Sequence, residues 1–281
     1  MSVDFRVYEV LDHGEIQLVD YMGSDEAIER AARVSYSGGD ESRKKSDRRG
    51  LIRYLMRHRH TSPFEMAELV FRVKCPIYVQ RQWIRHRTAS VNEISGRYSE
   101  LPNEYHEQSE WRAQSSSNKQ GSEGSVEEYE PLRFATSAGS WEWLGTTESA
   151  AFDEYRNRLD AGVAREQART CLPLSTYTEF VWKINLHNLL HFLSLRLDSH
   201  AQQEIREYAQ HIAGIVEKAF PLTWEAFKDY RLDAITLSGP EVRAIQKYDL
   251  VIAATGSGPL EPLSDRECKE VNEKLKVLNG D

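Results

Sequence analysis

Two segments of alternating apolar and polar residues, 67–74 and 176–184, are each followed at once by a segment with helical spacing. Side chains that alternate along the chain point to opposite faces of a strand, so both segments predict half-buried β-strands. Pro76 ends the first strand and opens a predicted helix over 77–86. The second strand runs into 186–197, which is apolar enough for a buried helix. This order of elements predicts an α/β (α+β) fold, with a mixed sheet flanked by helices.

The N-terminal part predicts a hairpin and two helices. Residues 4–21 hold two runs of strand-forming residues with a His-Gly turn between them. Ser24 is placed to cap a helix over 25–36. Apolar residues at helical spacing then predict a helix over 45–58.

The second half predicts two long helices. Thr147 is placed to cap a helix over 148–169, which Gly162 weakens by about 1 kcal/mol relative to alanine. Residues 201–219 form the clearest amphipathic helix of the chain, and Pro221 closes it.

Residues 112–127 are rich in Ser, Gly and Gln, a composition typical of a mobile surface loop. We therefore expect a single domain over 1–232 with a mobile insertion at about 112–127. Residues 233–281 form a C-terminal extension to which the sequence assigns no role.

The charge balance excludes bulk attraction to nucleic acid or to an anionic membrane. The 281 residues include 36 Lys and Arg against 44 Asp and Glu, a formal net charge of −8. No window approaches the ~20 apolar residues of a membrane span, and the N-terminus does not read as a secretory signal. We expect no nucleic-acid partner and no membrane association.

The three cysteines, Cys75, Cys171 and Cys268, lie far apart in the sequence. They form no CxxC pair and no disulfide framework. Such usage is typical of a reducing compartment, so we expect a cytoplasmic protein.

The most informative stretch runs from Leu69 to Asn92, where no acidic residue occurs. On a helix Arg81 and Arg85 lie at i,i+4 and would repel each other unless an anion sits between them. Arginine suits a phosphate because its planar fork donates two hydrogen bonds. This pattern predicts a phosphate site at a helix end, and a basic surface patch is the alternative. The basic residues of the stretch are Arg72, Lys74, Arg81, Arg85 and Arg87.

A second polar pattern follows directly. Glu93, Ser95 and Arg97 alternate with other residues, so in an extended chain all three side chains point the same way. A carboxylate, a hydroxyl and a guanidinium on one side suit a ligand with anionic and hydrogen-bonding parts. An exposed strand face is the alternative.

Residues 85–98 read RHRTASVNEISGRY, which resembles the RHRxxSxNExSxRY signature of flavin-dependent thymidylate synthases. Residues 58–65, HRHTSPFE, resemble the HxxxPFE segment of that family. Residues 165–196 resemble its second conserved block, and DSHAQ follows at 198–202. Met66 departs from the pattern, since many relatives carry a histidine there.

The resemblance implies a methyltransferase that converts dUMP to dTMP. The carbon donor is 5,10-methylenetetrahydrofolate, and FAD reduced by NADPH supplies the hydride. The family forms homotetramers whose active sites are shared between subunits. It uses no cysteine nucleophile on the pyrimidine, which agrees with the cysteines here.

The resemblance also implies residue roles. Arg196 is linked to ionisation at N3 of the uracil, His60 lies near the flavin and the folate, and Ser95 is a third catalytic residue. The residues expected to bind dUMP are Gln82, Arg85, Glu93, Ser95, Gly96, Arg97, Arg169 and Arg196. Those expected to bind FAD are Ser62, Arg85, His86, Arg87, Glu93, Asn185, His187 and His191. No metal is implied.

Two other classes of protein share features with this sequence. His187 and His191 have the i,i+4 spacing of metal ligands on a helix, with His200 as a conceivable third ligand, so a zinc hydrolase is one alternative. Asn188, however, stands where a zinc hydrolase carries its general-base glutamate. The other alternative is a nucleic-acid binder that uses 72–97, which the acidic net charge and the scarcity of stacking aromatics disfavour.

Overall fold

The computed structural model describes residues 3–35, 47–116, 121–126, 129, 134–135, 141–142, 146–240 and 242–243. The chain divides into two compact units, Met1–Leu232 and Asp233–Asp281. Most of the expected C-terminal extension therefore lies outside the described residues. All elements named below belong to the first unit.

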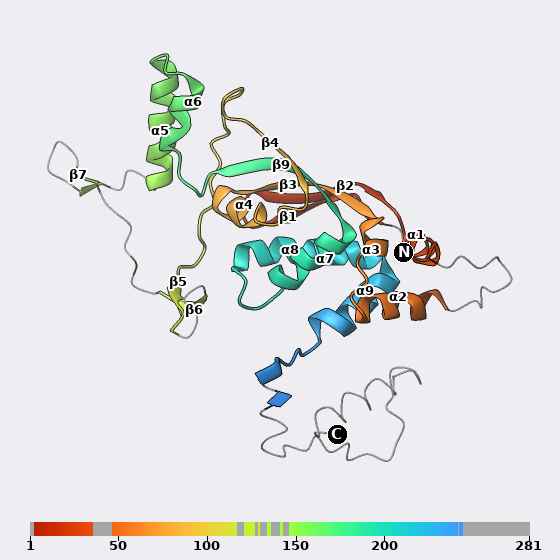
Figure 1. Cartoon of the computed structure of the whole chain (residues 1–281). Helices are drawn as coiled ribbons and strands as arrows, with labels where there is room; N and C mark the ends of the chain where they lie inside the picture. The colour runs from red at the N-terminus through yellow and green to blue at the C-terminus, as the bar shows by residue number, and fades with distance from the viewer. Residues whose placement is uncertain are drawn as a thin grey trace. The chain divides into compact units, whose positions relative to one another are not determined.

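A five-stranded sheet forms the centre of this unit (Figure 1). Its strands, in spatial order, are β1 (Val7–Val10), β2 (Gly14–Met22), β3 (Glu68–Pro76), β9 (Tyr177–Asn185) and β4 (Ser90–Glu93). The predicted N-terminal hairpin and both alternating strands are confirmed, as is the α/β class. The expectation of a mixed sheet is wrong, because every strand pair that the structure describes in this sheet is antiparallel.

The alternation of β3 and β9 explains why one face of the sheet is apolar. Directly opposite residues of an antiparallel pair share a face. Phe71 pairs with Trp182 and Val73 pairs with Phe180, and all four side chains are buried. This face is the one that the helices cover.

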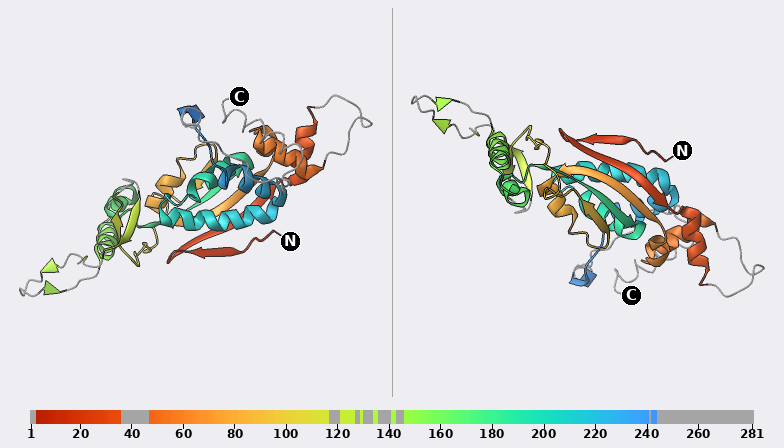
Figure 2. Two further views of the ribbon diagram at one scale, coloured as in Figure 1. Left: turned by 90° about the horizontal axis from the view of Figure 1, so that it is seen from below. Right: turned by 90° about the horizontal axis from the view of Figure 1, so that it is seen from above.

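Three helices lie against the apolar face: α4 (Ile77–Trp83), α7 (Leu186–Arg196) and α8 (Gln203–Ala219). In Figure 2 the left view shows the molecule from the side of these helices, and the right view shows it from the side of the strands. Trp83 is fully buried at their junction, with its ring centroid 5.3 Å from that of Trp182 and 5.0 Å from that of Phe192. Large aromatic side chains bury much apolar area, so this cluster anchors the helices to the sheet. The predicted helices over 186–197 and 201–219 are confirmed.

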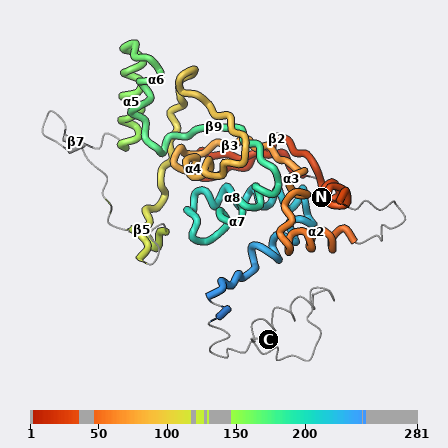
Figure 3. Tube along the Cα trace, viewed as in Figure 1, coloured from red at the N-terminus to blue at the C-terminus, as the bar shows by residue number. Residues whose placement is uncertain are grey.

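Four shorter helices pack at one end of the sheet, and α2 lies against α9 (Figure 3). The carboxylate of Asp25, which is 7% exposed, accepts hydrogen bonds from the backbone N–H groups of Leu222 and Thr223. It thereby caps α9, a helix that the sequence did not predict. These helices are α1 (Asp25–Arg33), α2 (Arg48–Arg57), α3 (Ser62–Glu65) and α9 (Pro221–Phe227), which continues into η3 (Lys228–Leu232).

The long helix expected over 148–169 is broken. Thr146, rather than Thr147, caps α5 (Thr147–Asp160). Gly162 then adopts a φ of +81°, in the left-handed region that glycine enters without strain. The chain turns there into α6 (Arg165–Ala168) and η2 (Arg169–Cys171).

The expected loop over 112–127 contains a small hairpin. Strands β5 (Arg112–Gln114) and β6 (Ser122–Ser125) pair antiparallel, while 117–120 lie outside the described residues. Arg112 donates to the buried carboxylate of Glu204 at 2.6 Å, which ties the hairpin to α8. Strands β7 (Phe134–Ala135) and β8 (Trp141–Glu142) form a second short pair.

Within the described part of the chain, none of the helices combines the length and apolarity needed to cross a bilayer.

Candidate active site

The basic signature begins where α4 ends. The helix stops at Trp83, three residues before the predicted end. The N–H of Arg85 donates to Gln82 O at 3.3 Å and that of His86 to Trp83 O at 3.0 Å, so the last turn is tightened by i→i−3 bonds. Arg85 therefore lies beyond the helix, and the predicted i,i+4 pair with Arg81 on one helix face is wrong.

Strand β4 carries Glu93 beside the end of α4. Its two carboxylate oxygens accept hydrogen bonds from Gln80 Nε2 at 3.0 Å and Thr178 Oγ1 at 2.6 Å. Both donors were missed by the sequence analysis. Gln80 is only 4% exposed, and a buried polar side chain needs a hydrogen-bond partner. Its position on an apolar helix face was the one sequence signal that could have identified it.

The chain does not stay extended after Glu93. Strand β4 ends there, and the N–H of Tyr98 donates to Ser95 O at 3.0 Å, which closes a turn. Ser95 Oγ accepts from the N–H of Arg97 at 3.3 Å inside this turn. The prediction that Glu93, Ser95 and Arg97 lie on one side of an extended chain is therefore wrong, because Ser95 and Arg97 belong to the turn.

The turn brings the two conserved blocks together at Gly96. This residue is buried, and a Cβ atom built on it would lie 3.1 Å from Cδ of Arg169 and 3.1 Å from Cδ1 of Leu101. The side chain of Arg169 thus packs directly against the signature, although the two positions are far apart in the sequence. Glycine suits this position because a Cβ atom would force the side chains of Arg169 and Leu101 to shift by a few tenths of an ångström.

The two blocks are in contact a second time at the end of α7. Arg196 Nε donates to His86 Nε2 at 3.2 Å, and its Nη2 lies 3.5 Å from Gln82 O. The amide of Gln82 in turn contacts Gln202, which the sequence analysis did not select. A half-buried cation therefore faces the signature histidine.

Burial and charge keep this histidine neutral. The pKa of His86 is lowered to about 4, first by burial and then by the positive charge of Arg196. Burial also lowers the pKa of Arg196. Among the described residues no carboxylate pairs with Arg196, so its charge is available to an anionic ligand.

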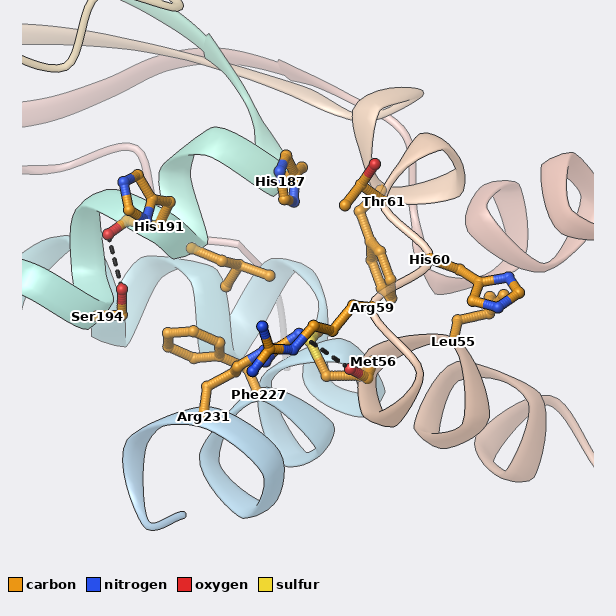
Figure 4. A pocket seen from close by; sticks show the side chains of 12 residues that line it. Leu55, Met56, Arg59, His60, Thr61, His187, His191, Ser194, Phe227 and Arg231 are labelled. Carbon is orange, nitrogen blue, oxygen red and sulfur yellow. Dashed lines mark hydrogen bonds between the residues drawn. The ribbon is translucent and has the colours of Figure 1, made fainter. Parts of the chain in front are cut away.

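A pocket of about 340 Å³ lies between α2, α3, α7 and α9 (Figure 4). His187 and His191 line it from α7, and burial lowers the pKa of His187. His60 also borders the pocket, but Figure 4 shows its ring turned away from the two α7 histidines. The pocket is lined by Leu55, Met56, Arg59, His60, Thr61, Phe64, His187, Leu190, His191, Ser194, Phe227 and Arg231.

The remaining predicted residues lie apart from this pocket. Arg85 and Arg87 are exposed, and the guanidinium of neither residue forms a hydrogen bond or ion pair with a described residue. Ser62 is the exposed first residue of α3, next to Thr61 in the pocket wall. Asn185 caps α7 by accepting from the N–H of Asn188 at 2.9 Å.

The alternative of a zinc hydrolase finds no support in the described residues. They contain no group of three His, Cys, Asp or Glu side chains that could hold a metal ion. His200, the conceivable third ligand, is paired with Asp198 at 2.8 Å.

Comparison with known proteins agrees with this geometry. Residues 17–222 match the family model described as thymidylate synthase complementing protein. The chain is 50% identical over 255 residues to a flavin-dependent thymidylate synthase of Thermus thermophilus, covering 89% of this chain and 90% of the relative. It is 49% identical over 281 residues to the enzyme of that name from Gluconobacter oxydans, covering 98% and 88%.

A solved structure is also similar. The crystal structure of the UMP/dUMP methylase PolB from Streptomyces cacaoi, bound with 5-Br dUMP, matches with a TM-score of 0.62 and 35% identity. The match covers 80% of this chain and 99% of PolB. With the signature, the packing of its two halves and these relatives in agreement, the chain belongs to the flavin-dependent thymidylate synthase family.

Proposed function

We propose that this protein methylates dUMP to dTMP, with 5,10-methylenetetrahydrofolate as carbon donor and NADPH-reduced FAD as hydride source. Family membership supports the reaction, and the similarity to a dUMP methylase supports the substrate. The observation that carries the proposal is the half-buried guanidinium of Arg196, which lies against His86 and has no described carboxylate partner.

Arg196 would act on the pyrimidine ring. A fixed cation beside the ring stabilises the anion formed when N3 loses its proton, and so polarises the ring for carbon–carbon bond formation at C5. Because the pKa of His86 is held near 4, this imidazole stays neutral and adds no competing charge. Its Nε2 accepts from Arg196 and so orients the guanidinium.

The phosphate of dUMP would be bound by arginines of both conserved blocks. Arg169 packs against Gly96, and Arg97 follows in the same turn. Together with Arg85 they would offset the nearly two negative charges of a phosphate monoester through bidentate hydrogen bonds. Gln82, Glu93 and Ser95 would supply hydrogen bonds to the rest of the nucleotide.

The pocket beside α7 suits a flavin. Flat heteroaromatic rings bind in pockets with apolar walls and a few hydrogen-bonding groups. Phe64, Leu190 and Phe227 supply apolar surface, while His187 and His191 offer imidazole nitrogens. These residues would hold FAD, which, when bound and reduced by NADPH, would supply the hydride for the methyl group. We assign Ser62, Arg85, His86, Arg87, Glu93 and Asn185 to the same cofactor, and place His60 where it orients the folate or relays a proton.

The state of the cysteines supports a mechanism without a thiolate nucleophile. Cys75 is fully buried, and burial together with the charge of Glu93 raises its pKa well above the ordinary value. A buried thiol of high pKa stays protonated at neutral pH and is inert as a nucleophile.

We further propose a cytoplasmic homotetramer whose active sites are shared between subunits. In each subunit 1–232 would form the catalytic domain, with an insertion near 112–127 that is mobile apart from its attachment through Arg112. The exposed arginines Arg85 and Arg87 lie outside the α7 pocket, so a neighbouring subunit would complete their site. One row of the uncovered sheet face contains Val7 and Val181, which are 44% and 42% exposed and suit burial against another chain. The free thiols of Cys75 and Cys171 agree with a reducing compartment.

The test is an anaerobic assay on the purified full chain with dUMP labelled by tritium at C5. We expect a flavin absorption spectrum, and release of tritium with formation of dTMP only when FAD, NADPH and the folate are all present. Light scattering of the same sample checks the tetramer. A preparation that binds neither flavin nor dUMP overturns the proposal.

A further inference from the structure

Two guanidinium groups at the α7 pocket take no part in the reaction described above. Arg59 follows the end of α2, and Arg231 lies in η3, yet both line the same pocket. Figure 4 shows their side chains next to each other, across the pocket from His187. No Asp or Glu is among the lining residues of this pocket.

Arg231 is held in place by the backbone. Its Nη2 donates to Met56 O at 3.2 Å, at the C-terminal end of α2. The pKa of this guanidinium is lowered, first by burial and then by the positive charge of Arg59. Two like charges held this close to each other beside a pocket, without an acidic partner in its wall, form a site that an anion would stabilise.

The backbone of Arg59 gives independent evidence that its side chain matters. Its N–H donates to Met56 O at 3.3 Å, and the next N–H, of His60, donates to Leu55 O at 2.9 Å. These two bonds form a Schellman motif that ends α2, with Arg59 at the position where glycine is favoured. Its φ is +58°, so an arginine here is strained where glycine would not be. The backbone at this position favours glycine over arginine, so the arginine side chain is the feature that needs a reason.

We propose that Arg59 and Arg231 bind a phosphate group of a dinucleotide that enters the α7 pocket. Two guanidinium forks match the charge and the oxygen geometry of a phosphate. The apolar and imidazole side chains opposite them suit the ring system of the same ligand or of its partner in the reaction. The inference rests on the proposed function, in which the pyrophosphate of FAD and the 2′-phosphate of NADPH are the two sources of such a phosphate.

The test compares the parent protein with Arg59→Gly and Arg231→Gln. Affinity for FAD and for riboflavin, which lacks phosphate, is measured by flavin fluorescence on flavin-depleted protein. Flavin reduction by NADPH and by NADH is measured anaerobically on the reloaded protein. Arg30→Gln, which removes an exposed arginine on α1, is the charge-matched control.

We expect both variants to lose affinity for one dinucleotide by about tenfold, as removal of a charged hydrogen bond does. If FAD is the source, FAD binding weakens while riboflavin binding does not. If NADPH is the source, the preference for NADPH over NADH falls while FAD binding is kept. Arg59→Gly should melt at the same temperature as the parent or higher, so a loss of binding in this variant is not a loss of fold.

Two results would overturn the inference. One is unchanged affinity for FAD and unchanged preference for NADPH in both variants. The other is equal weakening for ligands with and without the phosphate. A parent protein that neither binds FAD nor oxidises NADPH would instead refute the proposed function, so the two failures are distinguishable.

Discussion

Arg196 at the end of α7 and His86 in the signature turn share a hydrogen bond of 3.2 Å from Nε to Nε2. A neutral imidazole thus orients a cation that burial has partly removed from water. The two residues belong to different sequence blocks and lie 110 positions apart in the chain. It is also the point where substitutions test the chemistry most directly.

Arg196→Gln removes the cation but keeps a hydrogen-bonding side chain. We expect the variant to retain flavin while dTMP formation falls by at least about hundredfold, because charge stabilisation in the reacting complex is lost. The flavin spectrum of the purified variant and its rate of tritium release check this. Near-parental turnover in the variant would contradict the role of Arg196.

The same substitution should change the titration of His86. Its pKa is about 4, against an ordinary value of 6.5. Above about pH 6.5 the imidazole is neutral in both the folded and the unfolded state, so it does not oppose folding. As the pH falls from about 6.5 toward about 4, the unfolded state takes up the proton first, and the free energy of unfolding decreases. In Arg196→Gln the pKa should rise, since a repelling charge is gone. An NMR titration of the imidazole C–H signals measures the shift, and an unchanged or lower midpoint would argue against the coupling.

Gly96→Ala tests the contact between the two blocks. The added methyl group would approach Arg169 and Leu101 to 3.1 Å, so Arg169 must move. We expect the KM for dUMP to rise about tenfold, with unchanged flavin content, because a bidentate phosphate contact is misplaced. Gly50→Ala is the matched control, since a Cβ there meets no atom within 4 Å. Equal effects of the two substitutions on the KM for dUMP would show that the contact between Gly96 and Arg169 does not position the phosphate.

Cys75→Ala tests the absence of a thiolate nucleophile. The residue is fully buried, so the smaller side chain should lower the free energy of unfolding by about 1 kcal/mol. The kcat for dTMP formation should remain close to that of the parent. Cys171→Ala, at a half-buried position, serves for comparison. Loss of turnover in a folded, flavin-bearing Cys75→Ala variant would require a different mechanism.

Arg112→Ala tests the attachment of the β5–β6 hairpin. The Glu204 side chain is 3% exposed, and its Oε2 has no hydrogen-bond partner among the described residues, so Arg112 is the group that compensates its charge. Leaving a buried carboxylate unpaired should cost about 3 kcal/mol in the free energy of unfolding, measured by urea titration. Adding Glu204→Gln to this variant should recover part of the loss. A single variant as stable as the parent would show that the hairpin is not held by this pair.

Local patterns in the sequence were enough to determine the strands near 67–74 and 176–184, the amphipathic helix near 201–219 and the signature at 85–98. Strand and helix periods depend only on neighbouring residues, so they can be read along the chain. The capping of α1 by Ser24 belongs to the same class, because its oxygen reaches only the next turn, at Ala27 N.

The tertiary structure alone decided which distant groups meet. Gln80 and Thr178 hold Glu93 because β4 lies beside β9, and Arg112 reaches Glu204 because the hairpin packs on α8. Arg59 and Arg231 share a pocket through the packing of α2 against α9 and η3. Such contacts depend on the path of the whole chain, and so does the burial that lowers the pKa of His86. Neither the contacts nor the burial produces a periodic pattern in the local sequence.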